Sequence, residues 1–325
     1  MKRKNKYLFM VILLITMTLL SYGMITADSY MYKEKKEGQF KIVTSFYPMY
    51  VAVLNLTDGA SQVVVKNLTE NQTGCLHDYQ LSPQDMAHLS DADAFVINGG
   101  GMESFMEEVA QDYEELPVIT AAENVPMLKN EEIGHHHEED EHEEEEEHSG
   151  HEHDHGTYNA HVWMNVEYYM QEIETIRDGL CKLNPENENV YKANAEQYLE
   201  KLEVLHEEAK ALPKASVEEP VIIFHDSFAY FAENYGFSVC QVVEVEENSA
   251  LRSGQLANII EEVKEEDIRL LLAEKQYSVK AAETIAAQTD AKVYVLDSLV
   301  TGSGDKDSYL NGMRNNFAVL KEALQ

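Results

Sequence analysis

Short apolar segments alternate with helical segments twice along this chain, once on each side of a long polar stretch. Such alternation favours a parallel sheet whose two faces are covered by helices. In the first series we expect strands at 40–46, 63–66, 94–98 and 118–120, with helices from 48 and over 82–89 and 103–110. In the second we expect strands at 221–224, 238–243, 270–273 and 292–296, with helices over 227–235, 253–265, 278–289 and 309–324. The sequence therefore predicts an α/β protein with two doubly wound lobes.

Two helices are expected between the two series. The first covers 165–183 and stops at Asn184-Pro185, and the second covers 186–212. At a rise of 1.5 Å per residue the second is about 40 Å long, enough to join two lobes rigidly. We therefore assign residues 40–185 to an N-terminal lobe, 186–212 to a linking helix, and 213–325 to a C-terminal lobe.

Residues 130–157 interrupt the first lobe with an acidic, histidine-rich loop. Eight of the chain's 13 histidines lie within 135–155, interleaved with Asp and Glu. The tract has no large apolar side chain with which to build a core, but imidazoles and carboxylates bind divalent metals. The composition therefore indicates metal handling, with secondary sites at His135, His136, His137, His142, His148, His151, His153 and His155.

The N-terminus reads as a targeting segment over residues 1–27. Four basic residues within the first six precede an apolar run over 7–20, as in a secretory signal peptide. With the softer residues that follow, the run reaches roughly 20 residues, so an uncleaved anchor is an alternative. Residues 28–39 form a polar tether. Either reading places the body of the protein outside the cytoplasmic membrane, secreted or anchored to its outer face.

Charge and cysteine content narrow the function classes. The net charge is −34 and no basic stripe is available to meet phosphates, which argues against nucleic acid and suits a cation-binding protein. The cysteines are Cys75, Cys181 and Cys240, an odd and sparse set that does not make a disulfide framework. We expect small buried side chains, with Cys75 also a candidate metal ligand because it lies two residues before His77.

Four side chains stand where a doubly wound sheet binds its ligands, beyond the carboxyl ends of the strands or in the loops there. They are His77, His161, His225 and Asp297, two from each half of the chain. Facing lobes would bring them together as three nitrogens and one oxygen, a shell that suits tetrahedral zinc. Glu274 ends another predicted strand and competes with Asp297 for the fourth position. Each histidine taken alone could equally be a local hydrogen-bonding residue.

Several motifs occur together in one order. They are Ile42-Val-Thr-Ser-Phe-Tyr-Pro-Met-Tyr, His77-Asp-Tyr-Gln-Leu-Ser-Pro-Gln-Asp-Met, Ala92-Asp-Ala-Phe-Val-Ile-Asn-Gly, His161-Val-Trp-Met-Asn, Phe224-His-Asp-Ser-Phe-Ala-Tyr-Phe, Ala281-Ala-Glu-Thr-Ile-Ala and Leu296-Asp-Ser-Leu. From about Ile42 to Leu324 the chain thereby resembles the zinc- and manganese-binding solute-binding proteins of bacterial metal ABC transporters, the cluster A-I family.

The resemblance implies His77, His161, His225 and Asp297 as metal ligands, in two lobes bridged by a rigid helix. In this family the third ligand is Glu in the manganese branch and His in the zinc branch, so His225 implies Zn²⁺. Nitrogen donors also favour zinc over manganese chemically. The chain departs from the family's motifs at Leu76, Gln80 and Asn165, which puts contacts around the ligands in doubt rather than the ligands themselves.

The resemblance also implies a function. The chain would be an extracytoplasmic monomer that captures Zn²⁺ and delivers it to the permease subunit of an ABC transporter with its cytoplasmic ATPase. The alternatives within the family are a manganese-binding component and a surface adhesin. A zinc hydrolase is a rival from another class, but the chain has no H-E-x-x-H pattern and a fourth protein ligand would close the site. We therefore expect no enzyme.

Overall fold

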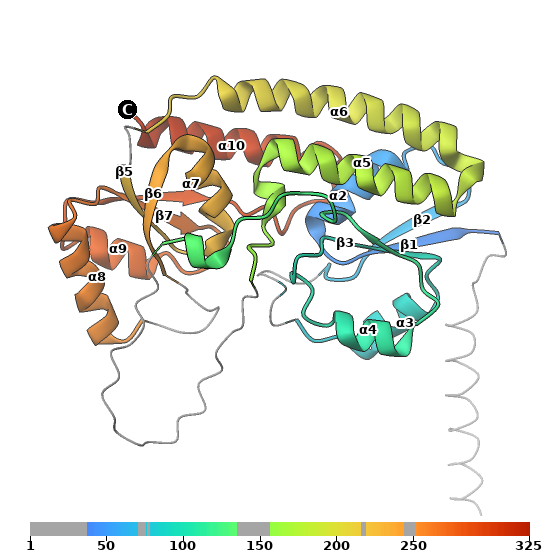
Figure 1. The fold of residues 1–325 in the computed structure, drawn as a ribbon, viewed down its shortest axis with the longest axis horizontal. Helices are drawn as coiled ribbons and strands as arrows, with labels where there is room; N and C mark the ends of the chain where they lie inside the picture. The colour runs from blue at the N-terminus through green and yellow to red at the C-terminus, as the bar shows by residue number, and fades with distance from the viewer. Residues whose placement is uncertain (1–37, 71–75, 77–78, 135–156, 216–218, 244–250) are drawn as a thin grey trace, which may run out of the picture. The chain divides into compact units, whose positions relative to one another are not determined.

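The structure is a computed structural model of the 325-residue chain, shown in Figure 1. It describes residues 38–70, 76, 79–134, 157–215, 219–243 and 251–325. The predicted targeting segment, most of the tether, the histidine tract, His77 and Cys75 lie outside these residues. Within the ranges described, no helix has the length and apolarity needed to cross a bilayer.

The first series of elements builds a four-stranded sheet with strand order β2-β1-β3-β4. All its neighbouring strands pair in parallel. The elements are β1 (Phe40–Thr44), α2 (Tyr47–Leu56), β2 (Val63–Asn67), α3 (Pro83–Ser90), β3 (Ala94–Ile97), α4 (Met106–Asp112) and β4 (Val118–Thr120). The strand order steps outward on both sides of β1, so the crossovers place helices on both faces, as the alternation predicted.

The second series repeats this topology with strand order β6-β5-β7-β8, again entirely parallel. The elements are β5 (Glu219–Ile223), α7 (Ala229–Tyr235), β6 (Phe237–Val242), α8 (Ser253–Glu265), β7 (Leu270–Glu274), α9 (Lys280–Ala286), β8 (Lys292–Leu296) and α10 (Ser308–Ala323). The predicted fold class, two α/β lobes with parallel sheets, is thus confirmed (Figure 1).

Neighbouring residues of each central strand enter different cores, because side chains alternate between the faces of a sheet. In β1, Ile42 joins a large central cluster while Val43 joins a smaller one under α3 and α4. In β5, Ile223 joins the same central cluster while Ile222 packs under α8 and α9. The central cluster therefore runs through both lobes, and each lobe adds a private core on its outer face.

Two long helices lie against this shared core, α5 (Val166–Leu183) and α6 (Glu188–Lys210). Figure 1 shows α6 running alongside α5 and then α10. Near its start, the Asn194 side-chain amide donates to the Leu56 carbonyl at 2.9 Å. Near its end, Glu208 forms a bidentate ion pair with Arg314 of α10, at 2.8 and 3.1 Å. The helix thus bonds to both lobes, which is consistent with the proposed linking role of 186–212.

Helix starts follow local capping chemistry. Ser82 caps α3: its hydroxyl accepts from the Asp85 N–H at 3.3 Å, while the Asp85 carboxylate accepts from the Ser82 N–H at 2.8 Å. Asn165 caps α5 by accepting from the Glu167 N–H at 2.9 Å. Both caps sit where polar residues precede the helical pattern, and the cap predicted at Ser82 is confirmed.

Some helices begin later than the sequence pattern predicts, for tertiary reasons. Glu103, expected to open a helix, is buried and accepts from the backbone N–H groups of Asn98 and Gly99 at 2.8 and 3.0 Å, so α4 starts only at Met106. The stretch 186–212 begins with a 3-10 turn, Pro185–Asn187, before α6. In each case the missing turn is replaced by hydrogen bonds that periodicity does not encode.

One buried carboxyl gives the fold a pH dependence. Glu172 of α5 is fully buried, and neither of its oxygens has a hydrogen-bond partner in the part of the chain that the structure describes. Burial raises its pKa well above the ordinary value, and the nearby Glu103 raises it further. The folded state therefore binds this proton more tightly than the unfolded state does. Its contribution to stability is full below the ordinary glutamate pKa and is lost as pH rises through the folded-state pKa.

Replacing Glu172 with glutamine is expected to remove this pH dependence, since an amide does not ionise. The free energy of unfolding of the Glu172→Gln variant should exceed that of the wild type by a margin that grows as pH rises from about 5 to about 9. Urea unfolding at several pH values measures this margin. The exposed Glu167 lies on the same helix, and Glu167→Gln is the matched control. A margin that stays constant with pH would show that Glu172 does not ionise in this range.

Candidate metal centre

His225 follows β5 at the carboxyl edge of the second sheet. The Phe224 N–H still donates to Leu272 of β7 at 2.8 Å, so the ladder fixes the backbone up to the residue before His225. The next turn begins at Asp226, whose carboxylate Oδ1 lies 3.2 Å from His225 Nδ1. Glu274, at the end of β7, places Oε2 3.3 Å from the same Nδ1. Two parallel strand ends thereby gather one imidazole and two carboxyl groups.

His161 comes from the loop before α5 and is fully buried. The Asn159 side-chain oxygen accepts from the His161 N–H at 2.9 Å and lies 3.1 Å from His161 Nδ1. An amide oxygen can only accept, so this contact places a proton on Nδ1 and leaves the lone pair on Nε2. The Asn159 amide nitrogen donates to the Asp226 carbonyl at 2.9 Å. Asn159 therefore holds the loop of His161 against the turn that follows His225.

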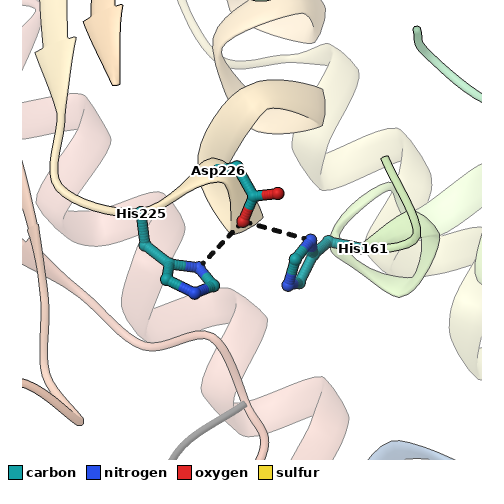
Figure 2. Close-up of side chains that lie close together, drawn as sticks. All are labelled: His161, His225 and Asp226. Carbon is teal, nitrogen blue, oxygen red and sulfur yellow. Dashed lines mark ion pairs between the residues drawn. The ribbon is translucent and has the colours of Figure 1, made fainter. Parts of the chain in front are cut away.

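Figure 2 shows the resulting cluster of His161, His225 and Asp226. The two imidazole rings stand edge to face, with centroids 5.1 Å apart and planes at 87°. Asp226 Oδ1 lies 3.5 Å from His161 Nδ1 and 3.2 Å from His225 Nδ1. One ligand atom from each residue lies within 4.8 Å of the others. Two nitrogens and one oxygen at this spacing are enough to begin a zinc shell.

The tautomer of His225 is not fixed by a single partner. Its Nδ1 accepts from the Ser227 N–H at 3.1 Å, which requires a lone pair there. The Asp226 and Glu274 carboxyl oxygens near the same atom would instead accept from an Nδ1–H when ionised. Burial raises the pKa of Glu274, while the opposing effect of His225 lowers it. A neutral Glu274 fits the first arrangement, and an ionised one would orient a metal-bound imidazole from behind.

Asp297, the predicted fourth ligand, lies at the end of β8 but has other partners. Its Oδ2 accepts from Lys275 Nζ at 2.9 Å. Its Oδ1 accepts from Gln276 Nε2 at 2.6 Å and from the Leu299 N–H at 2.9 Å. It lines a cavity of about 320 Å³, together with Tyr47 of α2 and residues of the loop after β8. The structure thus brings His161 and His225 together and holds Asp297 apart from them, while His77 lies outside the described residues.

The structure also adds Asp226, which the sequence analysis did not single out. The available signal was its position directly after His225 at a strand end, where a carboxylate faces the same space. Of the remaining histidines, His88 is half-buried with Nδ1 3.4 Å from Lys66 Nζ, and burial lowers its pKa. Cys181 and Cys240 are free, half-buried thiols, as expected.

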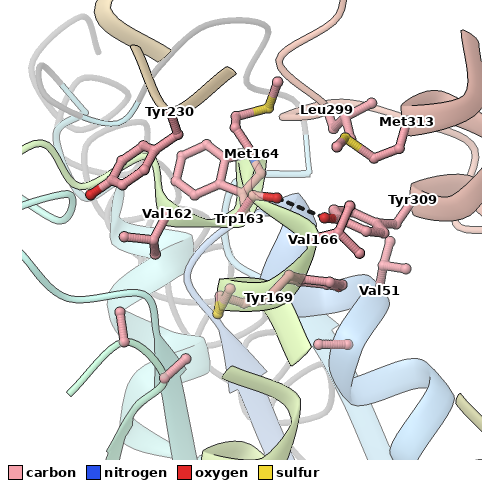
Figure 3. Packing of buried hydrophobic residues seen from close by; sticks show 14 of the residues in the cluster. Val51, Val162, Trp163, Met164, Val166, Tyr169, Tyr230, Leu299, Tyr309 and Met313 are labelled. Carbon is pink, nitrogen blue, oxygen red and sulfur yellow. Dashed lines mark hydrogen bonds between the residues drawn. The ribbon is translucent and has the colours of Figure 1, made fainter. Parts of the chain in front are cut away.

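A dense apolar layer lies directly behind the site and is shown in Figure 3. Trp163, two residues after His161, is fully buried and donates from Nε1 to the Ser298 carbonyl at 2.8 Å. Its own carbonyl accepts from the Tyr309 hydroxyl at 2.7 Å. Tyr309 stacks on Tyr169 with ring centroids 3.9 Å apart. The loop of His161 is therefore bonded to the second lobe at two points and cannot move independently of it.

With this geometry in view, comparisons with known proteins are informative. The chain is 29% identical over 295 residues to the zinc-binding protein AdcA of Streptococcus pyogenes serotype M3, covering 88% of this chain and 56% of that protein. It is 27% identical over 299 residues to the high-affinity zinc uptake system protein ZnuA of Bacillus subtilis, covering 90% and 89%. The chain spans only about half the length of the streptococcal relatives it matches.

Solved structures agree on the fold. The SBP FpvC from Pseudomonas aeruginosa, in complex with Mn²⁺, superposes with a TM-score of 0.74 at 25% identity, covering 88% of this chain and 99% of that one. The profile of a family described as "ZnuA: Zinc-uptake complex component A periplasmic" matches residues 42–323, nearly the whole described body. This chain therefore belongs to the ZnuA family of metal-uptake components.

Proposed function

We propose that this chain captures Zn²⁺ outside the cytoplasmic membrane and hands it to a membrane permease. The observation that carries the proposal is the pairing of two buried imidazoles from distant segments, His161 and His225, with Asp226 between them. Two such rings facing each other beside a carboxylate are costly to bury unless they bind something. The zinc-binding relatives and the family description support the same cargo.

The choice of zinc rests on donor chemistry. Imidazole nitrogen suits zinc, whereas manganese prefers oxygen ligands. The ligand set that we propose is His77, His161, His225 and Asp297, with Glu274 as the alternative fourth ligand. Asp226 is the carboxylate nearest to both described imidazoles and orients them. The histidines of the 135–155 tract would add weak secondary sites that concentrate zinc near the centre.

The remaining parts of the proposal concern location and partners. The family description is of a periplasmic component of an uptake complex, rather than an enzyme. We propose that the loaded protein docks as a monomer on a permease served by a cytoplasmic ATPase. Residues 1–27 would act as the signal or anchor that keeps the body outside the membrane.

Native mass spectrometry with Zn²⁺ and Mn²⁺ tests the proposal. The protein used is a variant in which each of the eight tract histidines is replaced by serine, so that only sites outside the tract remain. We expect one zinc ion to stay bound and manganese to be held more weakly. No retained zinc would contradict capture at the centre and leave the tract as a low-affinity chelator. Tight manganese with weak zinc would assign the chain to manganese uptake instead.

A further inference from the structure

The sheet itself places a lysine beside the proposed fourth ligand. Strands β7 and β8 pair in parallel with Glu274 opposite Leu296, and the Lys275 N–H donates to the Leu296 carbonyl at 2.8 Å. Lys275 and Asp297 are therefore the next residues on the two adjacent strands, on the edge where the site lies. Their side chains meet there, with Nζ 2.9 Å from Oδ2.

The partners of Asp297 differ in charge. Gln276 and the Leu299 N–H are neutral donors to Oδ1, and they can stay in place when the carboxylate binds a metal. The Lys275 ammonium carries a full positive charge on Oδ2. A divalent cation at the same carboxylate would repel it strongly at this range. The lysine and the metal thus compete for one carboxylate.

The exposed fractions show which partner can leave. The Lys275 side chain is 68% exposed, whereas the Asp297 side chain is 19% exposed and held by its two neutral donors. Both side chains line the same cavity of about 320 Å³. Release of the ammonium into water needs only a rotamer change of a long, flexible side chain. The carboxylate keeps its place, so the ammonium is the replaceable group.

We propose that Lys275 is an internal competitor for the metal ion at Asp297. It pairs with the carboxylate in the metal-free protein, leaves when zinc is captured, and re-pairs as zinc is released. The lysine thereby lowers zinc affinity and favours delivery over retention. This inference rests on the proposed function, because it needs Asp297 to be a zinc ligand. It makes Lys275 a positioning residue that acts through Asp297.

A double-mutant cycle on the full chain tests this, with zinc titrated against a competing chelator. Trp163, the only tryptophan, has its ring centroid 5.1 Å from that of His161, so its fluorescence reports this centre rather than the tract. An exposed ion pair is weak, so Lys275→Gln should tighten zinc binding by about two- to fivefold. Lys275→Arg should restore the wild-type affinity. In an Asp297→Asn background, Lys275→Gln should change nothing, since no carboxylate remains to compete for.

Each outcome decides the matter. Lys280→Gln removes the same charge from an exposed position on the same lobe and is expected to have no effect. Equal tightening by Lys275→Gln in both backgrounds would overturn the inference, since the effect would then be general electrostatics. Unchanged affinity in Lys275→Gln while Asp297→Asn binds weakly would overturn the inference and leave zinc capture standing. Unchanged affinity in Asp297→Asn would also overturn it and point to another fourth ligand. Absence of tight zinc in the wild type would defeat the proposed function itself.

Discussion

Replacement of His225 by alanine is expected to weaken zinc binding at the centre by more than about 100-fold, because loss of a group merely supporting a ligand already costs 10–100-fold. The imidazole lies in contact with Asp226 and Glu274 and faces His161, so no other described side chain can take its position. The fold should survive, since the ring caps only one short turn through the Ser227 N–H. A chelator competition followed by Trp163 fluorescence measures the affinity.

The matched control is His206→Ala. This histidine lies on α6, far along the chain from the cluster and outside it, and its removal takes one imidazole away from the same protein. Its zinc affinity should equal that of the wild type. Equal affinities of the His225→Ala variant and the wild type would show that zinc is held elsewhere, and the proposed centre would have to be abandoned.

Replacement of Trp163 by alanine is expected to lower the free energy of unfolding by about 3–5 kcal/mol, the usual range for truncating a large buried aromatic residue. The ring is fully buried and packs edge to face on Phe46 with centroids 4.8 Å apart. Its loss would also leave the Ser298 carbonyl without its donor. Urea unfolding of the metal-free protein, followed by circular dichroism, measures the change.

Trp163→Phe separates packing from hydrogen bonding at this position. It keeps an aromatic ring and removes the N–H donor, so we expect a smaller loss of about 1–3 kcal/mol, the cost of an unsatisfied buried acceptor. If Trp163→Ala cost no more than Trp163→Phe, the ring would not contribute to the core in the way that its burial indicates. Both variants should be compared without zinc, because bound metal adds its own stabilisation.

Much of the fold could be predicted from the sequence, because hydrophobic periodicity and capping are local signals. The strands Val118–Thr120 and Lys292–Leu296 and the helix Ser253–Glu265 occur at their expected bounds. Boundaries shifted where a side chain was engaged elsewhere, as with Glu103, whose carboxylate binds backbone N–H groups instead of opening a helix. Such hydrogen bonds depend on tertiary contacts, and no window of sequence contains them.

The candidate site could be predicted only in part. His161 and His225 were found because ligands gather at the carboxyl ends of parallel strands, and they do lie together. The ion pair of Asp297 with Lys275 could not be foreseen, since it depends on the register of β7 with β8. Asp226 was within reach of the same argument, but only the imidazole beside it was considered. The complete ligand set stays a prediction, since His77 lies outside the described residues.

The continuous core bears on how cargo can be released. Residues of both lobes share one apolar cluster, and the loop of His161 is bonded to the second lobe through Trp163. Swinging the lobes apart would expose this layer to water at about 25 cal/mol per Å² of apolar surface. Unloading by a clamshell motion is therefore expensive for this molecule. A permease that accepts its ion has to work instead on the rim, drawing away single side chains such as Asp297 while the framework stays still.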